Sequence, residues 1–504
     1  MKEDNLDKLL TEIGGFGKYQ IRVTILLLVV TVFTYFTATA WLFETKGVNH
    51  RCRIPRCDEN TVVFKPSWWM NAIPSIANEP VSCGRYKRIS NISEEQCNAS
   101  DFNKNLVEIC NEYIYETSER SILQDFDLHC EENLWKLTSV GTLNSIGNLL
   151  GLPIAGILSD KYGRKTILII SISLSSLTGL IRSFANSYVF FISMVFVDSL
   201  CNAATYTTTF ILDPHIKKIV LRPFLRILYG VQLIILAYYW LLPESVRWLL
   251  IKARYLEAQN LINQIGKRKM EHFVSLQTLK ELCVDGADDL NTTESLKHLF
   301  KSCTLATRLL NCIFCWIIGT FVYYGLTINS VTLSSNTYLD FILTVLVEIP
   351  ASAVTFFLMG TFKRRFTLCA SFLMCGICCI AFIFIPKDFY WLRLCTYLLG
   401  KSFSAIDVSL IYTIASEMFP TTLRNSLVSV CSMFGRIGSM VAPQIPLLEL
   451  LWKPLPLVLF GSTSLIACAL SLMFPETKNT KLPDTIEESK YVGRHKEIIR
   501  LQDT

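Results

Sequence analysis

The chain has 504 residues, of which 51% are hydrophobic and 18% are charged, and its formal net charge is +6. Disordered, coiled-coil and collagen-like proteins are excluded, because they need more charge or more glycine and proline. Nucleic-acid binding is also disfavoured, since the basic residues form short clusters between apolar runs and not one continuous face. We therefore expect an all-α protein that crosses a lipid bilayer several times.

Eleven predominantly apolar segments follow one another along the chain. Each is long enough to cross a hydrocarbon core of roughly 30 Å as a helix, and a helix satisfies its own backbone hydrogen bonds in lipid. A polar stretch, residues 1–20, precedes the first segment, which therefore does not resemble a cleaved signal peptide. The predicted spans are 21–43, 135–158, 166–184, 188–212, 225–242, 308–329, 338–360, 366–386, 393–415, 425–446 and 455–474.

A long polar segment, residues 44–134, separates the first two spans and is called the loop domain below. It holds two acceptor sequences for N-glycosylation, at Asn91 and Asn98, although such acceptors are often unused. An even number of cysteines beside them predicts an extracellular domain held by disulfides, and six cysteines allow 15 pairings, of which the sequence favours none. These cysteines are Cys52, Cys57, Cys83, Cys97, Cys110 and Cys130.

A second polar segment, residues 243–307, is rich in lysine and arginine. Short basic clusters also occur at 161–165 and 363–365. Cytoplasmic loops carry an excess of these residues, so we predict that all three segments face the cytoplasm. The N-terminal 20 residues and the tail at 475–504 are expected on the same side.

Two sequence markers occur once in each half of the chain. The basic loop at 159–168 resembles the loop at 360–368, and the motif at 242–245 resembles the one at 474–477. Two parallel halves around a central cavity are a common plan among transporters. The repeat therefore predicts two helix bundles, formed by residues up to 242 and by residues 308–474.

The spacing of these markers differs between the halves. Arg164 and Pro243 lie 79 positions apart, whereas Arg364 and Pro475 lie 111 positions apart. The first half is thus short by about one span and one loop, and we expect a missing fifth helix near 213–224. Three explanations stay open: a lost exon, a divergent family member, or a miscounted span.

Several motifs together resemble one transporter family. They include a glycine- and arginine-containing loop, two Pro-Glu motifs and an acidic residue before a proline within a span. The matching segments are Gly156 to Lys165, Tyr238 to Leu250, Val347 to Ala351, Ser416 to Asn425, Trp452 to Leu457 and Phe474 to Lys478. The chain resembles the organic cation, organic anion and carnitine transporters of the major facilitator superfamily, closest to the insect-type organic cation transporters.

This resemblance implies a function and a fold. The fold is twelve helices in two bundles, of which eleven are recognisable here, with both termini in the cytoplasm. The implied function is transport of small organic cations or zwitterions across the plasma membrane by alternating access, without a cofactor. Expected partners are the organic ion and the bilayer, not a nucleic acid, and the coupling ion and oligomeric state stay open. An alternative is a transport-inactive isoform that acts as a membrane binding protein.

Charged residues at the ends of the spans are candidates for a conformational latch. We expect Glu417 to pair with Arg424 and Glu244 to pair with Arg247, although these charges can also serve only to set topology. Lys363 replaces the expected turn glycine in the second half, which argues against a second latch there. The candidate latch residues are Asp160, Gly163, Arg164, Lys165, Glu244, Arg247, Glu417 and Arg424.

Ionisable residues within the spans are costly and are functional candidates by default. The resemblance places Glu348 and the aromatic pair Tyr323 and Tyr324 beside the substrate, and makes Arg436 a charge-selectivity position that favours anions or zwitterions. The alternative is that these charges pair with one another to hold helices together. The predicted substrate-binding residues are Tyr323, Tyr324, Glu348, Lys401, Asp407 and Arg436.

Other residues are weaker candidates. Asp198 is a further ionisable residue within a span, next to Val195, which stands where relatives carry an arginine. The aromatic candidates are Tyr206, Phe210, Tyr239 and Tyr412. No set of residues typical of a hydrolase, a metal site or a nucleotide-binding loop occurs in the sequence, so we do not expect an enzyme.

Overall fold

The computed structural model describes most of both helix groups and of the loop domain. Among the predicted features, much of the first span, the link 213–224, the span 225–242 and Asn91 lie outside the described residues, as do Phe210, Tyr239 and Arg247 and the side chains of Asp160 and Tyr206. The described residues are 21–23, 26, 34, 37–55, 57–58, 63–76, 79–89, 97–117, 120–208, 243–244, 249, 252–266, 302–330, 337–386, 388–420, 423–478, 483 and 486–492.

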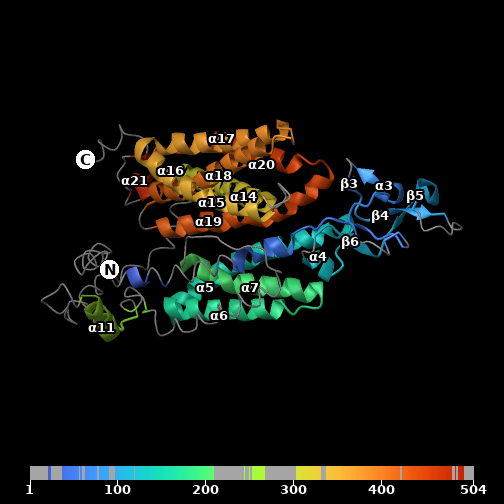
Figure 1. Ribbon diagram of the computed structural model, residues 1–504. Coiled ribbons are helices and arrows are strands. Elements are labelled where there is room, and N and C mark those ends of the chain that lie inside the picture. Colours follow the sequence, from blue (N-terminus) through green and yellow to red (C-terminus); the bar gives the residue numbers. More distant parts are fainter. Residues whose placement is uncertain are drawn as a thin grey trace.

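Two groups of long helices lie side by side, and the loop domain extends from one end of them (Figure 1). The first bundle contains α5 (Leu134–Tyr162), α6 (Arg164–Arg182) and α7 (Tyr188–Thr208). The second contains α14 (Cys303–Asn329), α15 (Thr337–Leu346), α16 (Glu348–Thr361), α17 (Arg364–Phe384), α18 (Tyr390–Met418), α19 (Arg424–Val441) and α20 (Leu455–Ser471). Two short helices, α11 (Tyr255–Gly266) and α21 (Ile486–Tyr491), lie at the end opposite the loop domain.

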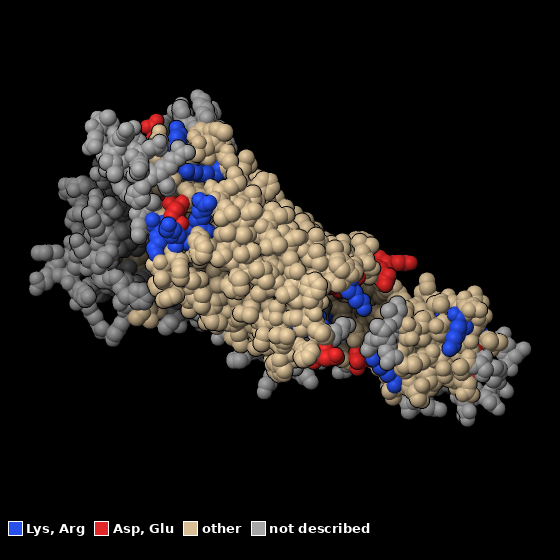
Figure 2. Space-filling model, turned by 90° about the horizontal axis from the view of Figure 1, so that it is seen from above, with Lys and Arg blue, Asp and Glu red and all other residues tan. Residues whose placement is uncertain are grey.

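Nine of the eleven predicted spans coincide with these helices. Within the described residues, seven helices or joined helix pairs are long and apolar enough to cross a membrane, and two shorter apolar helices accompany them. A broad uncharged band lies between charged residues at the two ends of the molecule in Figure 2. The protein is thus a largely helical membrane protein.

Prolines divide two of the predicted spans. Pro350 lacks the amide hydrogen that would bind the carbonyl of Leu346, and its ring crowds that carbonyl. The helix predicted at 338–360 therefore breaks at Val347 into α15 and α16. Likewise α19 ends at Val441, and the chain continues as a 3-10 helix, Ala442–Leu450, that contains Pro443 and Pro446.

The first bundle is held by close helix contact. A Cβ atom at Gly147 of α5 would lie only 2.7 Å from the carbonyl oxygen of Phe196 on α7. Only glycine permits this approach of two backbones, which is how helices gain packing contact in a membrane.

Several cysteines lie in the core of the second bundle. Cys312, Cys315, Cys375, Cys378 and Cys379 are all buried. Within the described parts of the chain, no three His, Cys, Asp or Glu side chains come together in a way that could hold a metal ion. Small polarizable side chains at these positions allow tight helix packing.

The six cysteines of the loop domain form three disulfides, which confirms the prediction of a disulfide-held domain. The pairs are Cys52–Cys110, Cys57–Cys97 and Cys83–Cys130. The domain also contains three small two-stranded antiparallel sheets: β1 (His50–Cys52) with β6 (Tyr113–Tyr115), β2 (Ser75–Ile76) with β3 (Glu79–Pro80), and β4 (Gly84–Arg88) with β5 (Phe102–Ile109).

A buried ion pair adds to the loop domain's small core. Arg51 and Asp58 are 0% and 1% exposed, and two guanidinium nitrogens donate to the two carboxylate oxygens at 2.9 and 2.8 Å. Arg51 also donates to the carbonyls of Val63 and Phe64, while the amide of Ile54 donates to Asp58. Full hydrogen bonding of this kind is what makes a buried pair tolerable.

Two histidines and two tyrosines, called the neck cluster here, pack just before α5 begins. His50 donates from Nδ1 to the carbonyl of Val48 at 2.8 Å, and its Nε2 is buried without a hydrogen-bond partner among the described residues. The ring of His129 stacks on Tyr113 with 4.0 Å between centroids, and its Nε2 lies 2.8 Å from the hydroxyl of Tyr115.

Burial disfavours the charged form of both neck histidines. It lowers the pKa of His129 to about 4, helped by the nearby His50 and opposed by the carboxylate of Asp127. Burial also lowers the pKa of His50, against the effect of its hydrogen bond to Val48. Both rings are therefore neutral at neutral pH.

The two bundles meet at the end that bears the loop domain. Gln444 exchanges hydrogen bonds with Thr138 and Thr142 of α5, and Ser145 donates to the carbonyl of Ser439 on α19 at 2.9 Å. Figure 1 shows α5 beside α19 along this contact. The two bundles are thus in direct contact at the loop-domain end.

Candidate functional site

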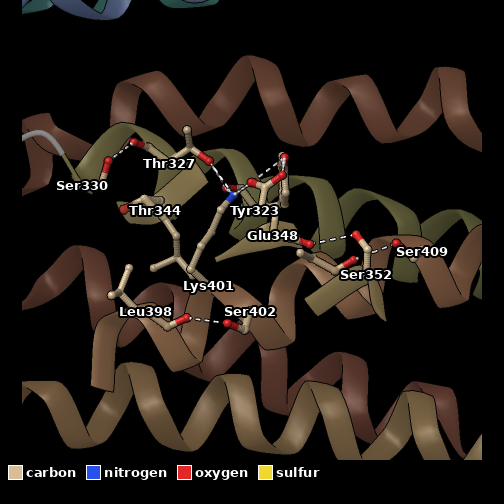
Figure 3. A network of polar contacts seen from close by, with 12 residues as sticks. Tyr323, Thr327, Ser330, Thr344, Glu348, Ser352, Leu398, Lys401, Ser402 and Ser409 are labelled. Carbon is tan, nitrogen blue, oxygen red and sulfur yellow. Dashed lines mark hydrogen bonds and ion pairs between the residues drawn. The ribbon is translucent and has the colours of Figure 1, made fainter. Parts of the chain in front are cut away.

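Three helices of the second bundle bring an acid, a base and a tyrosine together in its interior (Figure 3). Lys401 of α18 lies 3.1 Å from Glu348 of α16, measured from Nζ to Oε1. The hydroxyl of Tyr323, on α14, donates its hydrogen to that carboxylate and lies 2.8 and 2.9 Å from the two carboxylate oxygens. These residues, taken from separate predicted spans, thus form one polar network.

The lysine is more deeply enclosed than the acid. Lys401 is 0% exposed, and its Nζ lies 3.3 Å above the ring of Tyr323. It also donates to the hydroxyl of Thr327 at 2.7 Å and to the carbonyl of Tyr323 at 3.2 Å. Glu348 remains 27% exposed, so the carboxylate is the part of the pair that another ion can reach.

The proline break explains why Glu348 can occupy this place. Glu348 begins α16 directly after the interruption at Val347, and its backbone carbonyl accepts from Ser352 at 2.8 Å. A carboxylate at a helix N-terminus is favoured by the partial positive charge there. The sequence Val-Glu-Ile-Pro therefore determines both where the helix breaks and that an acid lies at the start of the next helix.

A second cation lies next to this network. Tyr324 packs edge-on against Tyr323 with 5.2 Å between ring centroids, and Arg436 of α19 donates to its hydroxyl at 3.4 Å. Five of the six predicted substrate-binding residues are therefore joined by direct contacts. They are Tyr323, Tyr324, Glu348, Lys401 and Arg436.

Asp407, the sixth, is not part of this group. It is 1% exposed and forms a hydrogen bond with Ser371 of α17. Six helical positions separate it from Lys401, so the two side chains leave α18 in different directions. Tyr412, a weaker candidate, packs edge-on against Trp316, and its hydroxyl lies 3.0 Å from that of Ser432.

The first bundle contains a charged group that sequence reasoning did not identify. Arg182, at the end of α6, lies 3.4 Å from Glu44 and 3.7 Å from Asp198 of α7. Asp198 also accepts from Ser175 at 2.5 Å, and all three charged residues are buried. Glu44 and Arg182 fall at the edges of their apolar runs, where a charge is ordinary, so only Asp198 stood out in the sequence.

The helix ends opposite the loop domain confirm the internal repeat in three dimensions. Glu244 accepts from the backbone amide of Lys165 at 3.1 Å, at the start of α6. In the second half, Glu476 accepts from the amides of Arg364 and Arg365 at 2.9 and 3.3 Å, at the start of α17. In both halves the acid of the Pro-Glu motif therefore caps the helix that follows the basic loop.

The predicted pairing of Glu417 with Arg424 is wrong in this structure. Glu417 lies 3.4 Å from the guanidinium of Arg364 and also accepts from Thr477 at 2.6 Å. Nε and Nη2 of Arg424 are buried without a hydrogen-bond partner in the described part of the chain. Arg364 reaches Glu417 because the ends of α17 and α18 lie together, so the basic loop of the second half forms an ion pair despite lacking the turn glycine.

The first half lacks the matching contact among its described residues. Gly163, the turn glycine, has φ 104°, a conformation that favours glycine, and it separates α5 from α6. Arg164, which follows it, is exposed and forms no ion pair with any described residue. The two basic loops thus share a helix cap but not an ion pair.

Comparison with protein families gives two matches. The model described as "Sugar (and other) transporter" matches residues 204–485, and the model described as "Major Facilitator Superfamily" matches residues 122–212. An organic cation transporter protein of Drosophila melanogaster is 30% identical, over 97% of this chain and 95% of the relative. This chain belongs to the organic cation transporter family of the major facilitator superfamily. It is therefore a member of a transporter family and is embedded in a membrane.

Mammalian members of the family are similar over the same extent. Solute carrier family 22 member 2 of Homo sapiens is 27% identical, over 97% of this chain and 96% of the relative. The alignment with the Drosophila transporter runs over 533 positions, whereas 97% of 504 residues is about 489. About 44 aligned positions of that relative thus have no counterpart in this organic cation transporter family member.

Solved structures show the same fold at low identity. The inward open conformation of the xylose transporter XylE from E. coli has a TM-score of 0.54 and 16% identity, and covers 73% of this chain and 92% of XylE. A partially occluded inward open conformation of XylE has a TM-score of 0.57 and 13% identity, and covers 92% of this chain and 100% of XylE. The arrangement of helices is therefore that of the major facilitator fold.

Proposed function

We propose that this family member transports small organic ions, either organic cations or zwitterions of the carnitine type, across the plasma membrane by alternating access. The pair of Glu348 and Lys401 supports this most strongly, because it places both charge signs inside the apolar part of the second bundle. Charged side chains there are costly and mark paths for substrates or ions.

In this proposal, the ammonium group of Lys401 occupies the position that the ammonium group of a substrate would take. It already forms the contacts that an organic cation would need: a carboxylate at 3.1 Å and a ring face at 3.3 Å. A substrate ammonium entering from the exposed side of Glu348 would share or replace these contacts, adding about 0.5–2 kcal/mol from the ring alone.

Arg436 favours a zwitterion over a simple cation. Its guanidinium is joined through the hydroxyl of Tyr324 to the network around Glu348. A substrate with an ammonium and a carboxylate would meet Glu348 with one end and Arg436 with the other. Guanidinium groups form bidentate hydrogen bonds with carboxylates, which orient the bound carboxylate as well as attract it.

The closed contact between the bundles supports alternating access. If the loop domain faces outside and the basic segments face the cytoplasm, the contacts of Gln444 and Ser145 close the outer end. The ion pair of Arg364 with Glu417 lies at the inner end of the second bundle alone. Transport then requires the outer contacts to break as the two bundles rock about the site.

Uptake into cells tests this proposal. Cells expressing the chain should accumulate labelled tetraethylammonium or labelled carnitine above cells without it, and Glu348→Gln should abolish the difference. Lys453→Gln, which alters an exposed lysine, is the matched control and should retain uptake. Uptake equal to the background for both probes, at proven surface expression, would contradict transport and favour the alternative below.

The alternative is a membrane binding protein that does not transport. The shorter marker spacing in the first half favours it, and the alignment with the Drosophila relative also leaves about 44 positions of that protein without a counterpart in this chain. Saturable binding of carnitine by the purified protein together with absent uptake would support this second function.

A further inference from the structure

Asp407 is a deeply buried acid of the second bundle. It lies near the middle of α18, about 25 Å along the helix from Tyr390, and is 1% exposed. Glu348 pairs with Lys401, and Asp198 lies near Arg182. Asp407 forms no ion pair with any residue that the structure describes, and its hydrogen bond is to Ser371.

A lone carboxylate in this place is energetically unfavourable. Moving an ionised carboxyl group into a protein interior costs several kcal/mol unless a cation and hydrogen bonds compensate for the lost water. One serine does not supply that compensation. A protonated, neutral carboxyl group avoids most of the cost.

The hydrogen bonds of Ser371 match a protonated acid. Its Oγ lies 3.1 Å from the carbonyl oxygen of Leu368 and is also in short contact with Oδ1 of Asp407. A serine hydroxyl has one hydrogen, which cannot serve both acceptors well. If Asp407 holds a proton, it donates to Ser371, and Ser371 donates to Leu368, so all three groups are satisfied.

We propose that Asp407 is a proton-binding site that couples proton movement to transport in this protein. One proton binds to the Asp407 carboxylate when the site is open to one side of the membrane and leaves when it is open to the other. This inference rests on the proposed transport function, and it reassigns Asp407 from substrate contact to ion coupling.

Ser404 lies between the proton site and the substrate site along α18. Lys401, Ser404 and Asp407 follow at three-residue steps on α18, each about 60° around the helix from the last. The hydroxyl of Ser404 is buried and has no hydrogen-bond partner in the described structure. It stands one helical turn from each neighbour and can both donate and accept a proton during exchange.

Three thiols of neighbouring helices lie near Asp407. Cys315 of α14, Cys375 of α17 and Cys468 of α20 are close enough to interact with its charge. In the described parts of these three helices no arginine or lysine is paired with Asp407, so binding of the proton is not opposed by a resident cation. The nearest lysine along α18, Lys401, is held by Glu348.

Purified protein in liposomes tests the coupling, with labelled carnitine and an imposed pH difference. One proton moved inward per cycle adds a factor of about ten to the final accumulation ratio for each pH unit. We expect the wild type to rise toward that limit. Asp407→Asn, which resembles the protonated acid in shape and charge, should bind carnitine but show an accumulation ratio independent of pH.

Ser409→Ala is the control, because Ser409 lies on an exposed face of the same helix and bonds only its own backbone. It should keep the wild-type response. A pH response in Asp407→Asn equal to that of the wild type would overturn the proposal, as would accumulation that follows a sodium gradient and not a proton gradient.

A second measurement does not depend on transport. The infrared carbonyl stretch of a protonated carboxyl group should be present in purified wild-type protein at neutral pH and absent from Asp407→Asn. If this band is present in the wild type and absent from Asp407→Asn but no uptake occurs, the proposed transport function is wrong and the proton-binding site is supported. If the band is unchanged in Asp407→Asn, the proton site fails independently of transport.

Discussion

At the scale of single residues, the two members of the central ion pair should differ in their effect on stability. Glu348→Gln leaves Lys401 charged and 0% exposed, and breaking a buried pair in this way costs about 3–5 kcal/mol. Lys401→Met should cost less, since Glu348 is 27% exposed and keeps the hydroxyl of Tyr323. Thermal unfolding of the purified variants measures this. The reverse order, or equal losses, would show that Lys401 is not held by Glu348.

The neck histidines should make the loop domain sensitive to acid. The folded state holds their pKa below the ordinary 6.5, to about 4 for His129, so the unfolded chain binds more protons between these values. Stability is therefore complete above pH 6.5 and falls as the pH drops toward 4. Hydrogen exchange of residues 45–55 and 110–117 should accelerate over this range. His129→Phe, which keeps the stacking on Tyr113, should weaken the pH dependence, and an unchanged profile in it would contradict this account.

At the scale of helices, the acid of each Pro-Glu motif caps a helix, whereas Glu417 forms an ion pair with Arg364. Substitutions can separate these two roles. Glu476→Gln should cost about 1 kcal/mol, because it weakens the cap of α17. Glu417→Gln should cost more, since it leaves Arg364, with an 18% exposed side chain, without its carboxylate. Melting temperatures of the two variants, with the exposed Asp388→Asn as control, test this order. An effect of Glu417→Gln no larger than that of Asp388→Asn would refute the ion pair.

The helices themselves were predictable because an apolar run of about 20 residues is a local property of the sequence. The break at Val347 followed from Pro350, yet the apolar pattern alone gave one continuous span. The partners of charged groups were not predictable in the same way. Glu417 joined Arg364 and not Arg424, and Arg182 joined Asp198, since these contacts depend on which helices lie side by side. The three disulfides were likewise expected as a set but not as pairs.

At the scale of the whole molecule, the internal repeat predicted a deficit in the first half. Distances between markers gave 32 residues, and the comparison with the Drosophila transporter leaves about 44 positions without a counterpart. We expect sequencing of the gene and its transcripts to find an additional exon between the codons for Leu212 and Leu225. An uninterrupted coding sequence there would show instead that the short first half is the protein's own form.

In the proposed function, the two bundles enclose one site that binds a small organic ion and opens alternately to both sides. Counterflow in liposomes tests it most directly: vesicles loaded with unlabelled carnitine are diluted into labelled carnitine, and entry of label is followed. We expect a transient accumulation of label that Glu348→Gln abolishes and Lys453→Gln preserves. Saturable binding of carnitine to the same purified protein, without any counterflow, would contradict it.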